Sequence, residues 1–256
     1  MGRGSSGGDG VAPILEVTAL EAGYTRLPIL SGMSLRCEQG QVTTIIGPNG
    51  CGKSTLLKAI VGLLRPRRGS VRFAGEDVTG WPPERLLTIG MAMLPQARSV
   101  FPDMTVAENL RLGGYILRDQ RTLRQRLDEV LSSFPRLADR RRQLAGTLSG
   151  GEQRMLELGR ALILHPKLLL MDEPSAMLSP ALLEALFTEI ARMPERGTTI
   201  LLVEQNIRKA FEITQRVYVL DYGTNYIDGT PAECLRDPRL AALYLGGAEP
   251  VTGTSQ

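Results

Sequence analysis

The sequence is poor in the residues from which disulfide-stapled and metal-bound proteins are built. Its 256 residues include three cysteines and one histidine, and aromatic residues make up 5% of the chain. Cys37, Cys51 and Cys234 are odd in number and far apart, which argues against a disulfide framework and against a zinc cluster. A small disulfide-rich secreted protein is therefore excluded.

Long apolar runs and an excess of one charge are also missing. No run approaches the ~18 residues that a membrane-spanning helix needs. The chain has 30 basic and 27 acidic side chains, a net charge of +3 that argues against nucleic acid as a partner. Because 43% of the residues are hydrophobic, a disordered chain is excluded too. These values predict a soluble, cytosolic protein of mixed class that binds no nucleic acid.

The two ends of the chain differ in composition from the rest. The first ten residues, MGRGSSGGDG, include five glycines and no apolar core, so they do not form a secretory signal. We expect flexible tails at residues 1–12 and 247–256, because glycine and serine bury too little apolar surface to offset ordering. One domain is expected between them, over residues 13–246.

Strand and helix patterns alternate along this domain. Expected strands are 14–20, 41–46, 70–73, 90–94, 168–171, 198–203, 217–220 and 224–227, and expected helices are 53–64, a short one opening at 82–83, 105–112, 122–134, 149–164 and 180–193. The last two strands are expected to form a hairpin around Asp221, Tyr222 and Gly223. Alternation of this kind predicts an α/β core with a parallel sheet, and the stretch of about 97–148 predicts a helical insertion.

A phosphate-binding motif lies between the strand expected at 41–46 and the helix expected at 53–64. It satisfies G-x-x-x-x-G-K-[ST] and comprises Gly47, Pro48, Asn49, Gly50, Cys51, Gly52, Lys53, Ser54 and Thr55. The glycines let backbone N–H groups approach phosphate oxygens, and the helix N-terminus adds partial positive charge. Lys53 is expected to reach the terminal phosphates and Ser54 to bind Mg²⁺. The alternative, a glycine-rich turn before a core helix, explains less of the pattern.

Two carboxylates end the apolar run expected as a buried strand at 168–171. Ligands of open α/β sheets bind beyond the carboxyl ends of the strands, so Asp172 is expected to hold Mg²⁺ there. Glu173 is expected to polarise a water for attack on the γ-phosphate. The alternative is a solvated acidic pair that ends a strand.

A second glycine-rich segment precedes the helix expected at 149–164. Ser149 and Glu152 have the spacing of a capping box, which is a sufficient local explanation. Gly150 and Gly151 also leave backbone amides bare at a helix N-terminus, as a second phosphate site would require. One nucleotide on one subunit cannot use both sets of amides, so this interpretation requires a second subunit.

The combination GPNGCGKST, Gln96 after a strand, LSGGEQ and LLLMDEP, in this order, resembles the ATPase subunit of ATP-binding-cassette transporters. The resemblance covers roughly residues 13–246 and implies a P-loop ATPase core with a mixed or parallel sheet, an antiparallel β region and a helical insertion. It implies ATP hydrolysis with ATP and Mg²⁺ as cofactors. It also implies that Tyr24 stacks on adenine and that Gln96 touches Mg²⁺ and senses a membrane partner. By the same resemblance, the residues that close on the γ-phosphate of the opposite subunit are Ser149, Gly150 and Gly151.

Three further segments, 99–110, 202–206 and 244–247, resemble one ATPase of the branched-chain amino-acid importer group. That group also contains urea and amide importers, and both solute classes stay open. The resemblance implies a second ATPase subunit in a homo- or heterodimer, two transmembrane permease subunits and an extracytoplasmic solute-binding protein. It places the chain peripherally on the cytoplasmic face of the inner membrane.

The chain departs from the family pattern at two places near the nucleotide. The switch position that usually carries histidine is Gln205, which can hydrogen-bond the γ-phosphate but carries no proton charge near neutral pH. Residues 175–179 read Ser-Ala-Met-Leu-Ser, without the aspartate usual there. Both departures bear on the turnover rate.

Two alternatives remain open at this stage. A cassette protein not coupled to transport usually has two cassettes in one chain or a long coiled-coil insertion, whereas this chain has one cassette and about 50 residues between Gln96 and Leu148. The apolar cluster Val100, Phe101, Pro102 and Met104 either forms a groove for a cytoplasmic helix of a membrane subunit or belongs to the core of the insertion.

Overall fold

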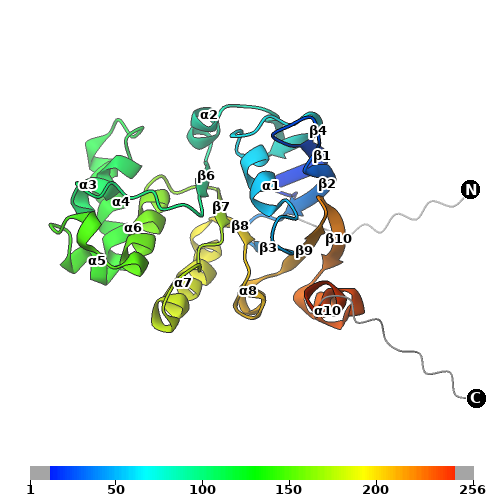
Figure 1. Ribbon diagram of the computed structural model, residues 1–256. Coiled ribbons are helices and arrows are strands. Elements are labelled where there is room, and N and C mark those ends of the chain that lie inside the picture. The colour runs from blue at the N-terminus through cyan, green and yellow to red at the C-terminus, as the bar shows by residue number, and fades with distance from the viewer. Residues whose placement is uncertain (1–11, 246–256) are drawn as a thin grey trace, which may run out of the picture.

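The computed structural model describes residues 12–245. The tails expected at 1–12 and 247–256 lie outside these residues, apart from residue 12. Within the described chain no helix is long and apolar enough to cross a membrane. Figure 1 shows strands gathered on one side of the molecule and a group of helices, from the middle of the chain, set apart on the other side.

The strands are β1 (Leu15–Ala22), β2 (Leu30–Cys37), β3 (Val42–Ile46), β4 (Arg68–Phe73), β5 (Glu76–Asp77), β6 (Met91–Leu94), β7 (Leu168–Asp172), β8 (Thr199–Val203), β9 (Arg216–Asp221) and β10 (Thr224–Gly229). The α-helices are α1 (Lys53–Ile60), α2 (Pro83–Thr88), α3 (Val106–Gly113), α4 (Gln120–Ser133), α5 (Pro135–Asp139), α6 (Gly150–Leu162), α7 (Pro180–Arg192), α8 (Ile207–Ile213), α9 (Pro231–Arg236) and α10 (Pro238–Leu245). Short 3-10 turns, η1 (Ala145–Thr147) and η2 (Pro194–Arg196), complete the set.

The strands form two sheets, as expected for this fold class. The larger has the order β10-β9-β3-β8-β7-β6, in which β10 alone runs antiparallel to its neighbour. The smaller is antiparallel, with the order β2-β1-β4-β5. The hairpin expected at 217–220 and 224–227 is β9–β10. The mixed sheet, the antiparallel region and the helical insertion predicted from the sequence are thus confirmed.

Burial on both faces of the sheet explains why the sequence of strand β7 is apolar up to its last residue. Successive side chains of a strand point to opposite faces of the sheet. Leu168 and Leu170 pack in the core that also contains α1 and the antiparallel sheet. Leu169 and Met171 pack in a second core against the helical insertion and α7. Because both faces are covered, all five residues of β7 are buried and no alternation with polar residues is possible.

Several predicted boundaries were wrong. The helix expected at 53–64 ends at Ile60, because Gly62 has a φ of +76° and a Cβ there would lie 1.9 Å from the carbonyl oxygen of Trp81. The helix expected to open at Thr122 begins at Gln120 instead. Its N-cap is Asp119, whose carboxylate accepts from the Arg121 and Thr122 N–H groups. Elements not expected from the sequence are β2, β5, α5, α8, α9 and α10.

The topology brings four loops to one edge of the larger sheet. Strands β3, β8, β7 and β6 are neighbours and run parallel, so their carboxyl ends meet at the same edge. The loops that follow these strands carry the phosphate-binding motif, Gln205, Glu173 and Gln96. Residues spread over more than 150 positions of the sequence are therefore gathered at one place.

Candidate nucleotide site

A cavity of about 410 Å³ opens at this edge of the sheet. Its lining combines backbone of the phosphate loop with polar side chains from the three neighbouring strand ends. The lining residues are Ile29, Asn49, Gly50, Gly52, Lys53, Ser54, Thr55, Gln96, Glu173 and Gln205. Most of the residues that the sequence assigned to ATP and to catalysis are thereby brought together.

Glycines are required in the phosphate loop by its conformation. Gly50 and Gly52 have φ angles of +82° and +112°, a region that side chains disfavour. A Cβ on Gly47 would lie 2.3 Å from the Leu220 carbonyl oxygen. Gly52 is also the N-cap of α1, and no side chain caps that helix, so its first N–H groups face the cavity. The sequence therefore builds an anion site from backbone alone.

Lys53 is held inside this loop rather than extended into solvent. Its ammonium donates to the carbonyl oxygens of Gly47, at 2.8 Å, and of Pro48, at 3.0 Å. The residue is buried, and it lines the cavity. A phosphate oxygen entering the cavity meets a positive charge that is already oriented by the loop.

Ser54 and Asp172 come together from α1 and the end of β7. The Ser54 hydroxyl donates to Oδ1 of Asp172 at 3.1 Å. Burial raises the pKa of the Asp172 carboxyl, and Glu173 beside it adds to the rise, against the opposing effect of the Ser54 hydrogen bond and the nearby lysines. Hydroxyl and carboxylate oxygens are hard ligands of the kind that Mg²⁺ prefers.

Glu173 is fixed by the two glutamines that the sequence had placed near it. Gln96 and Gln205 each donate through Nε2 to Oε2 of Glu173, at 2.8 and 2.9 Å. Gln205 also donates to Oδ1 of Asn49 in the phosphate loop, at 3.2 Å. Among the described residues Oε1 of Glu173 has no hydrogen-bond partner. That oxygen is available to accept a proton from a water bound in the cavity.

The backbone of Glu173 is strained. Its φ is +46°, in the left-handed region that a residue with a side chain seldom adopts. The Glu173 N–H donates to the Val203 carbonyl oxygen at 2.9 Å, which holds this conformation against β8. Backbone strain of this kind gathers at functional sites, where surrounding contacts enforce it.

Glu204 is a part of the site that the sequence did not reveal. Its buried carboxylate accepts from the N–H and hydroxyl of Ser175, at 3.1 and 2.7 Å. It also accepts from the N–H groups of Gln205 and Asn206, at 3.1 and 3.3 Å. Burial raises the pKa of Glu204 despite these bonds. The residue ties the loop after β7 to the loop after β8, and only the folded chain shows this pairing.

Arg154 of α6 is a second residue that the sequence did not single out. Its guanidinium donates to the carbonyl oxygens of Pro95, Asp172 and Pro174, at 2.7, 3.3 and 3.2 Å. It also pairs with Glu157 one turn along the helix, at 2.9 Å. The helix that begins with the LSGGEQ segment is therefore bonded directly to the strand ends that carry Gln96 and Glu173.

Ser149, Gly150 and Gly151 lie at the start of α6 and do not line this cavity. The expected capping box is present: the Ser149 hydroxyl accepts from the Glu152 N–H, and the Glu152 carboxylate accepts from the Ser149 N–H. A Cβ on Gly151 would lie 2.1 Å from Cδ1 of Leu182, so packing also favours glycine there. Their contact with a nucleotide stays a prediction.

Tyr24 lies in the loop between β1 and β2, outside the residues that line the cavity. Its side chain is 58% exposed, and the Lys58 ammonium lies 5.7 Å from the ring centroid. An exposed ring beside the phosphate-loop helix is free to stack on a base. That role also stays a prediction.

Comparison with known proteins settles the family. The ABC transporter family matches residues 30–176, a region that begins with β2 and runs past the Asp172-Glu173 pair. The chain belongs to the ABC transporter family. This ATP-binding cassette is an ATPase, and the resemblance found in its motifs is confirmed.

Named relatives cover almost the whole cassette. The branched-chain amino acid transport ATP-binding protein BraG of Pseudomonas aeruginosa is 42% identical over 224 residues, which are 88% of this chain and 96% of BraG. The probable branched-chain amino acid transport ATP-binding protein LivF of Archaeoglobus fulgidus is 39% identical, over 91% of this chain and 99% of LivF. The resemblance to ATPases of the branched-chain amino-acid importer group is thus confirmed.

A solved structure supports both fold and ligand class. The crystal structure of the ADP conformation of an ATP-binding cassette from an ABC transporter matches with a TM-score of 0.82 and 29% identity, over 92% of this chain and 100% of that one. The fold is therefore shared with a cassette described in an ADP conformation, and the phosphate loop predicts a nucleotide as the ligand here.

Proposed function

We propose that this chain is the ATP-hydrolysing subunit of an importer for branched-chain amino acids. The observation that carries the proposal is the cavity in which the phosphate loop, Glu173, Gln96 and Gln205 meet, with Asp172 bonded to Ser54 of its lining. BraG and LivF, at 42% and 39% identity, bear the names of branched-chain amino acid transport proteins. Those names supply the solute class, which the cassette itself does not contact.

ATP hydrolysis in this cavity follows from the placement of the side chains. Lys53 and the bare amides of α1 bind the β- and γ-phosphates and neutralise charge that builds during transfer. Oε1 of Glu173 accepts a proton from the attacking water, while Gln96 and Gln205 hold the carboxylate in place. Gln205 donates a hydrogen bond at the position where histidine is usual, so it positions groups without exchanging a proton.

Mg²⁺ fits the side-chain oxygen atoms that lie beside the phosphate loop. Ser54 Oγ and the Asp172 carboxylate would hold the ion, with Gln96 Oε1 as a third ligand from the protein. Within residues 12–245 no cluster of three or more His, Cys, Asp or Glu is arranged around a metal site. The remaining ligands would be phosphate oxygens and water, as Mg²⁺ prefers, and the ion would withdraw charge from the γ-phosphate.

A second ATPase subunit completes the site in this proposal. Ser149, Gly150 and Gly151 present a capped helix N-terminus away from the cavity of their own subunit. In a dimer they would close on the γ-phosphate held by Lys53 of the other subunit. The dimer can form with an identical chain or with a sister ATPase.

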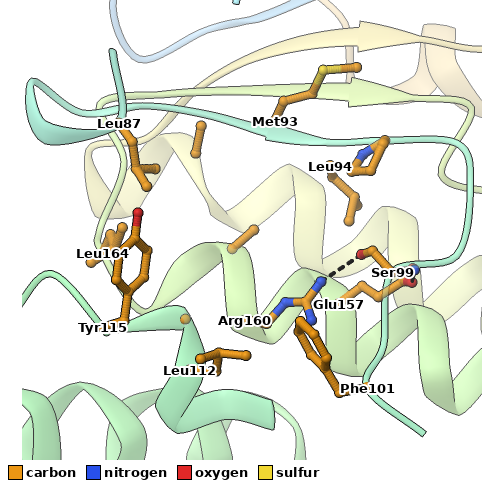
Figure 2. A pocket seen from close by; sticks show the side chains of 14 residues that line it. Leu87, Met93, Leu94, Ser99, Phe101, Leu112, Tyr115, Glu157, Arg160 and Leu164 are labelled. Carbon is orange, nitrogen blue, oxygen red and sulfur yellow. Dashed lines mark hydrogen bonds between the residues drawn. The ribbon is translucent and has the colours of Figure 1, made fainter. Parts of the chain in front are cut away.

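Two transmembrane subunits are the further partners that we propose, and a groove offers the docking site for them. It lies between β6 and the helices α3 and α6, and its lining includes Phe101, which is 45% exposed (Figure 2). Of the cluster at 100–104, Phe101 lines this groove while Val100 packs against the core of the insertion. The segment that carries Phe101 continues directly from Gln96, which bonds to Glu173.

These partners define the location and the assembly. A subunit bound to cytoplasmic loops of a permease lies peripherally on the cytoplasmic face of the inner membrane. An extracytoplasmic solute-binding protein would deliver the solute on the other side.

The test is co-purification followed by transport. The tagged chain is expressed in its native host. The membrane fraction is solubilised in detergent, and the tagged chain is captured from it together with whatever it binds. We expect two transmembrane proteins and a second ATPase to co-purify, and the reconstituted complex to take up leucine when ATP is supplied inside the vesicles. Uptake of urea in place of leucine would redirect the solute assignment. Capture without any transmembrane protein would favour a cassette that is not coupled to transport and would overturn the proposal.

A further inference from the structure

A further cavity lies where the helical insertion meets α7. Its volume is about 480 Å³, within the range of small-molecule sites, and its lining comes from the end of α4, from α5 and α6, and from α7. Figure 1 shows α7 beside the helices of the insertion. This cavity shares no lining residue with the nucleotide cavity or with the docking groove. The function proposed above therefore leaves it without a role.

Most of the wall of this cavity is apolar. Phe134 and Leu137 line it from the insertion, Met155 from α6, and Leu182 and Ala185 from α7. The first three of these side chains are buried, and they belong to the core that joins the insertion to the larger sheet. The wall therefore offers an apolar surface to a small molecule that enters between the insertion and α7.

One carboxylate in the wall is only half paired. Glu189 of α7 is buried, with 7% of its side chain exposed. Its Oε1 accepts from Nη1 of Arg196 at 2.6 Å, whereas its Oε2 has no hydrogen-bond partner within the described chain. The described side-chain atoms that are both fully enclosed and unpartnered belong to other residues, so this oxygen is reached from the cavity that Glu189 lines. A ligand that donates to Oε2 would replace the bonds to water that burial restricts.

The remaining charges of the lining differ from Glu189 in their pairing. Glu152 is fully engaged, because its Oε2 accepts from Ser149 and its Oε1 pairs with Arg140 at 3.3 Å. Arg136 of α5 and Arg192 of α7 are exposed and have no hydrogen bond or ion pair among the described residues. The cavity thus presents one free carboxylate oxygen and two free guanidinium groups.

Two of these free charges come from one face of α7. Glu189 and Arg192 are three residues apart, and residues at this spacing are neighbours on the surface of a helix. A ligand that binds both needs a positive and a negative group close together. Arg136 lines the same cavity from the insertion and adds a second positive charge for the negative group.

We infer that this cavity binds a free amino acid with an apolar side chain. The ammonium of the ligand donates to Oε2 of Glu189, its carboxylate accepts from Arg192 and Arg136, and its side chain packs on the apolar wall. A simple carboxylic acid would leave Oε2 of Glu189 without a donor, and a simple amine would leave both guanidinium groups without an acceptor. The inference stands on this cavity alone and does not require the proposed function.

The first experiment measures the ligand class on the full chain without nucleotide. Titration calorimetry compares leucine with 4-methylpentanoate, which lacks the ammonium, and with 3-methylbutylamine, which lacks the carboxylate. We expect saturable binding of leucine and at least about tenfold weaker binding of each analogue, since each loses a hydrogen bond to a charged group. Glutamate and lysine should also bind more weakly, because their charged side chains would enter an apolar wall. Equal affinity for either analogue, or no saturable binding of leucine, isoleucine, valine, methionine or phenylalanine, would overturn the inference.

The second experiment places the ligand in this cavity. Glu189→Gln puts an amide donor where the ammonium needs an acceptor, and it should weaken leucine binding about ten- to a hundredfold. Glu184→Gln is the matched control, because Glu184 is an exposed glutamate of the same helix and does not line the cavity. Arg192→Met should cost up to about fivefold, since an exposed pair contributes little, and Arg124→Met on α4 should match wild type.

ATP binding by each variant shows that it is folded. Should Glu189→Gln fail to bind ATP, Ala185→Phe decides, because Ala185 is exposed on α7 and the larger side chain would fill the cavity. Leucine binding should be lost in that variant. Wild-type affinity for leucine in a folded Glu189→Gln or Ala185→Phe protein would overturn the site. None of these measurements uses a transmembrane subunit, so their failure leaves the proposed function standing, and failure of the co-purification test leaves this inference standing.

Discussion

Lys53 is held by its own loop in the position that its proposed role in phosphate binding requires. Its ammonium is satisfied by two carbonyls of its own loop, so binding phosphate exchanges neutral acceptors for a charged one. Replacing Lys53 by alanine should weaken ATP binding about ten- to a hundredfold, because a hydrogen bond to a charged group contributes about 1.5–3 kcal/mol. Titration calorimetry with ATP measures this, and the exposed Lys167→Ala variant serves as control. Unchanged affinity in a folded Lys53→Ala protein would contradict the assignment.

If Asp172 holds Mg²⁺ as proposed, Mg²⁺ binding should depend on pH. Its pKa is raised, chiefly by burial, so the carboxyl keeps its proton at higher pH than an exposed aspartate. Mg²⁺ requires the ionised form, and Mg-ATP affinity should therefore fall as pH is lowered through the raised pKa. Without Mg²⁺ the sign is reversed: the folded state holds the proton more tightly, so the free energy of unfolding decreases as pH rises from the ordinary pKa to the raised one.

The measurement is thermal unfolding between about pH 4 and pH 7.5 with and without Mg-ATP, for wild type and Asp172→Asn. The pKa of Glu204 is also raised. Without Mg-ATP, Glu204 therefore makes the free energy of unfolding decrease with rising pH in wild type and in Asp172→Asn alike. The difference between the two proteins isolates Asp172. Equal Mg-ATP stabilisation of wild type at both ends of this range would contradict the prediction.

At this scale the sequence predicts residues that belong to contiguous motifs. Lys53, Asp172 and Glu173 could be assigned because glycine spacing and an apolar strand define their surroundings. Glu204 and Arg154 could not. The side-chain partner that ties Glu204 to another loop, Ser175, lies 29 residues away, and the carbonyl oxygens that bind Arg154 lie 18 or more residues away, so no local pattern marks either residue. Tertiary hydrogen bonds of this type become visible only when strand order is known.

Helix α6 connects the LSGGEQ segment, the catalytic strand ends and the docking groove. It does so through the Arg154–Glu157 pair, in which both side chains are buried. Glu157→Gln should lower the free energy of unfolding by about 3–5 kcal/mol, because it leaves Arg154 as a buried charge without its counterion. Glu16→Gln, which breaks the exposed pair with Arg36, should cost no more than about 1 kcal/mol.

Urea unfolding followed by circular dichroism compares the two variants. The prediction depends on the contrast, since both substitutions remove one carboxylate charge and keep the side-chain size. Equal losses in the two variants would contradict the structural role given to the α6 pair.

Elements with a strong pattern were predicted well, and elements defined by their neighbours were not. Strands β7 and β8 are continuous apolar runs, and both were found within a residue or two. Strand β2 escaped because its buried residues Leu30, Met33 and Leu35 are spaced irregularly, with a register shift against β1. Helices α8 and α9 are short and have little apolar periodicity, so packing on the larger sheet determines them.

At the scale of the whole molecule, the groove should matter for assembly and not for folding. Phe101 is half-exposed at the groove, whereas its neighbour Val100 packs against the core. Phe101→Asp should therefore leave ATP binding unchanged and abolish capture of the transmembrane subunits, because a charged carboxylate cannot enter an apolar contact. Tyr222→Asp is the control, since Tyr222 is 88% exposed and lies far from this groove in the β9–β10 turn.

Co-purification from detergent-solubilised membranes checks this prediction. Loss of ATP binding in Phe101→Asp would instead assign the residue to the core of the insertion. Full assembly of the variant would show that the transmembrane subunits bind elsewhere.

The division of the molecule into a strand-rich part and a helical part was predictable from the alternation of patterns (Figure 1). How the two parts cooperate was not, because the sequence does not show that Gln96 and Arg154 reach the same strand ends. The start of α6 lies outside its own cavity, which is the physical reason to expect a second subunit.

The most direct test of the account is the ATPase rate of Glu173→Gln in the assembled complex. The substitution keeps size and hydrogen bonding and removes the charge that accepts the proton. General-base catalysis contributes about 10²–10⁴-fold, so turnover should fall by that factor while ATP binding holds and an ATP-dependent dimer accumulates on size exclusion. Hydrolysis at the wild-type rate would show that Glu173 is not the base, and the absence of an ATP-dependent dimer, alone or with the sister ATPase, would contradict the shared site.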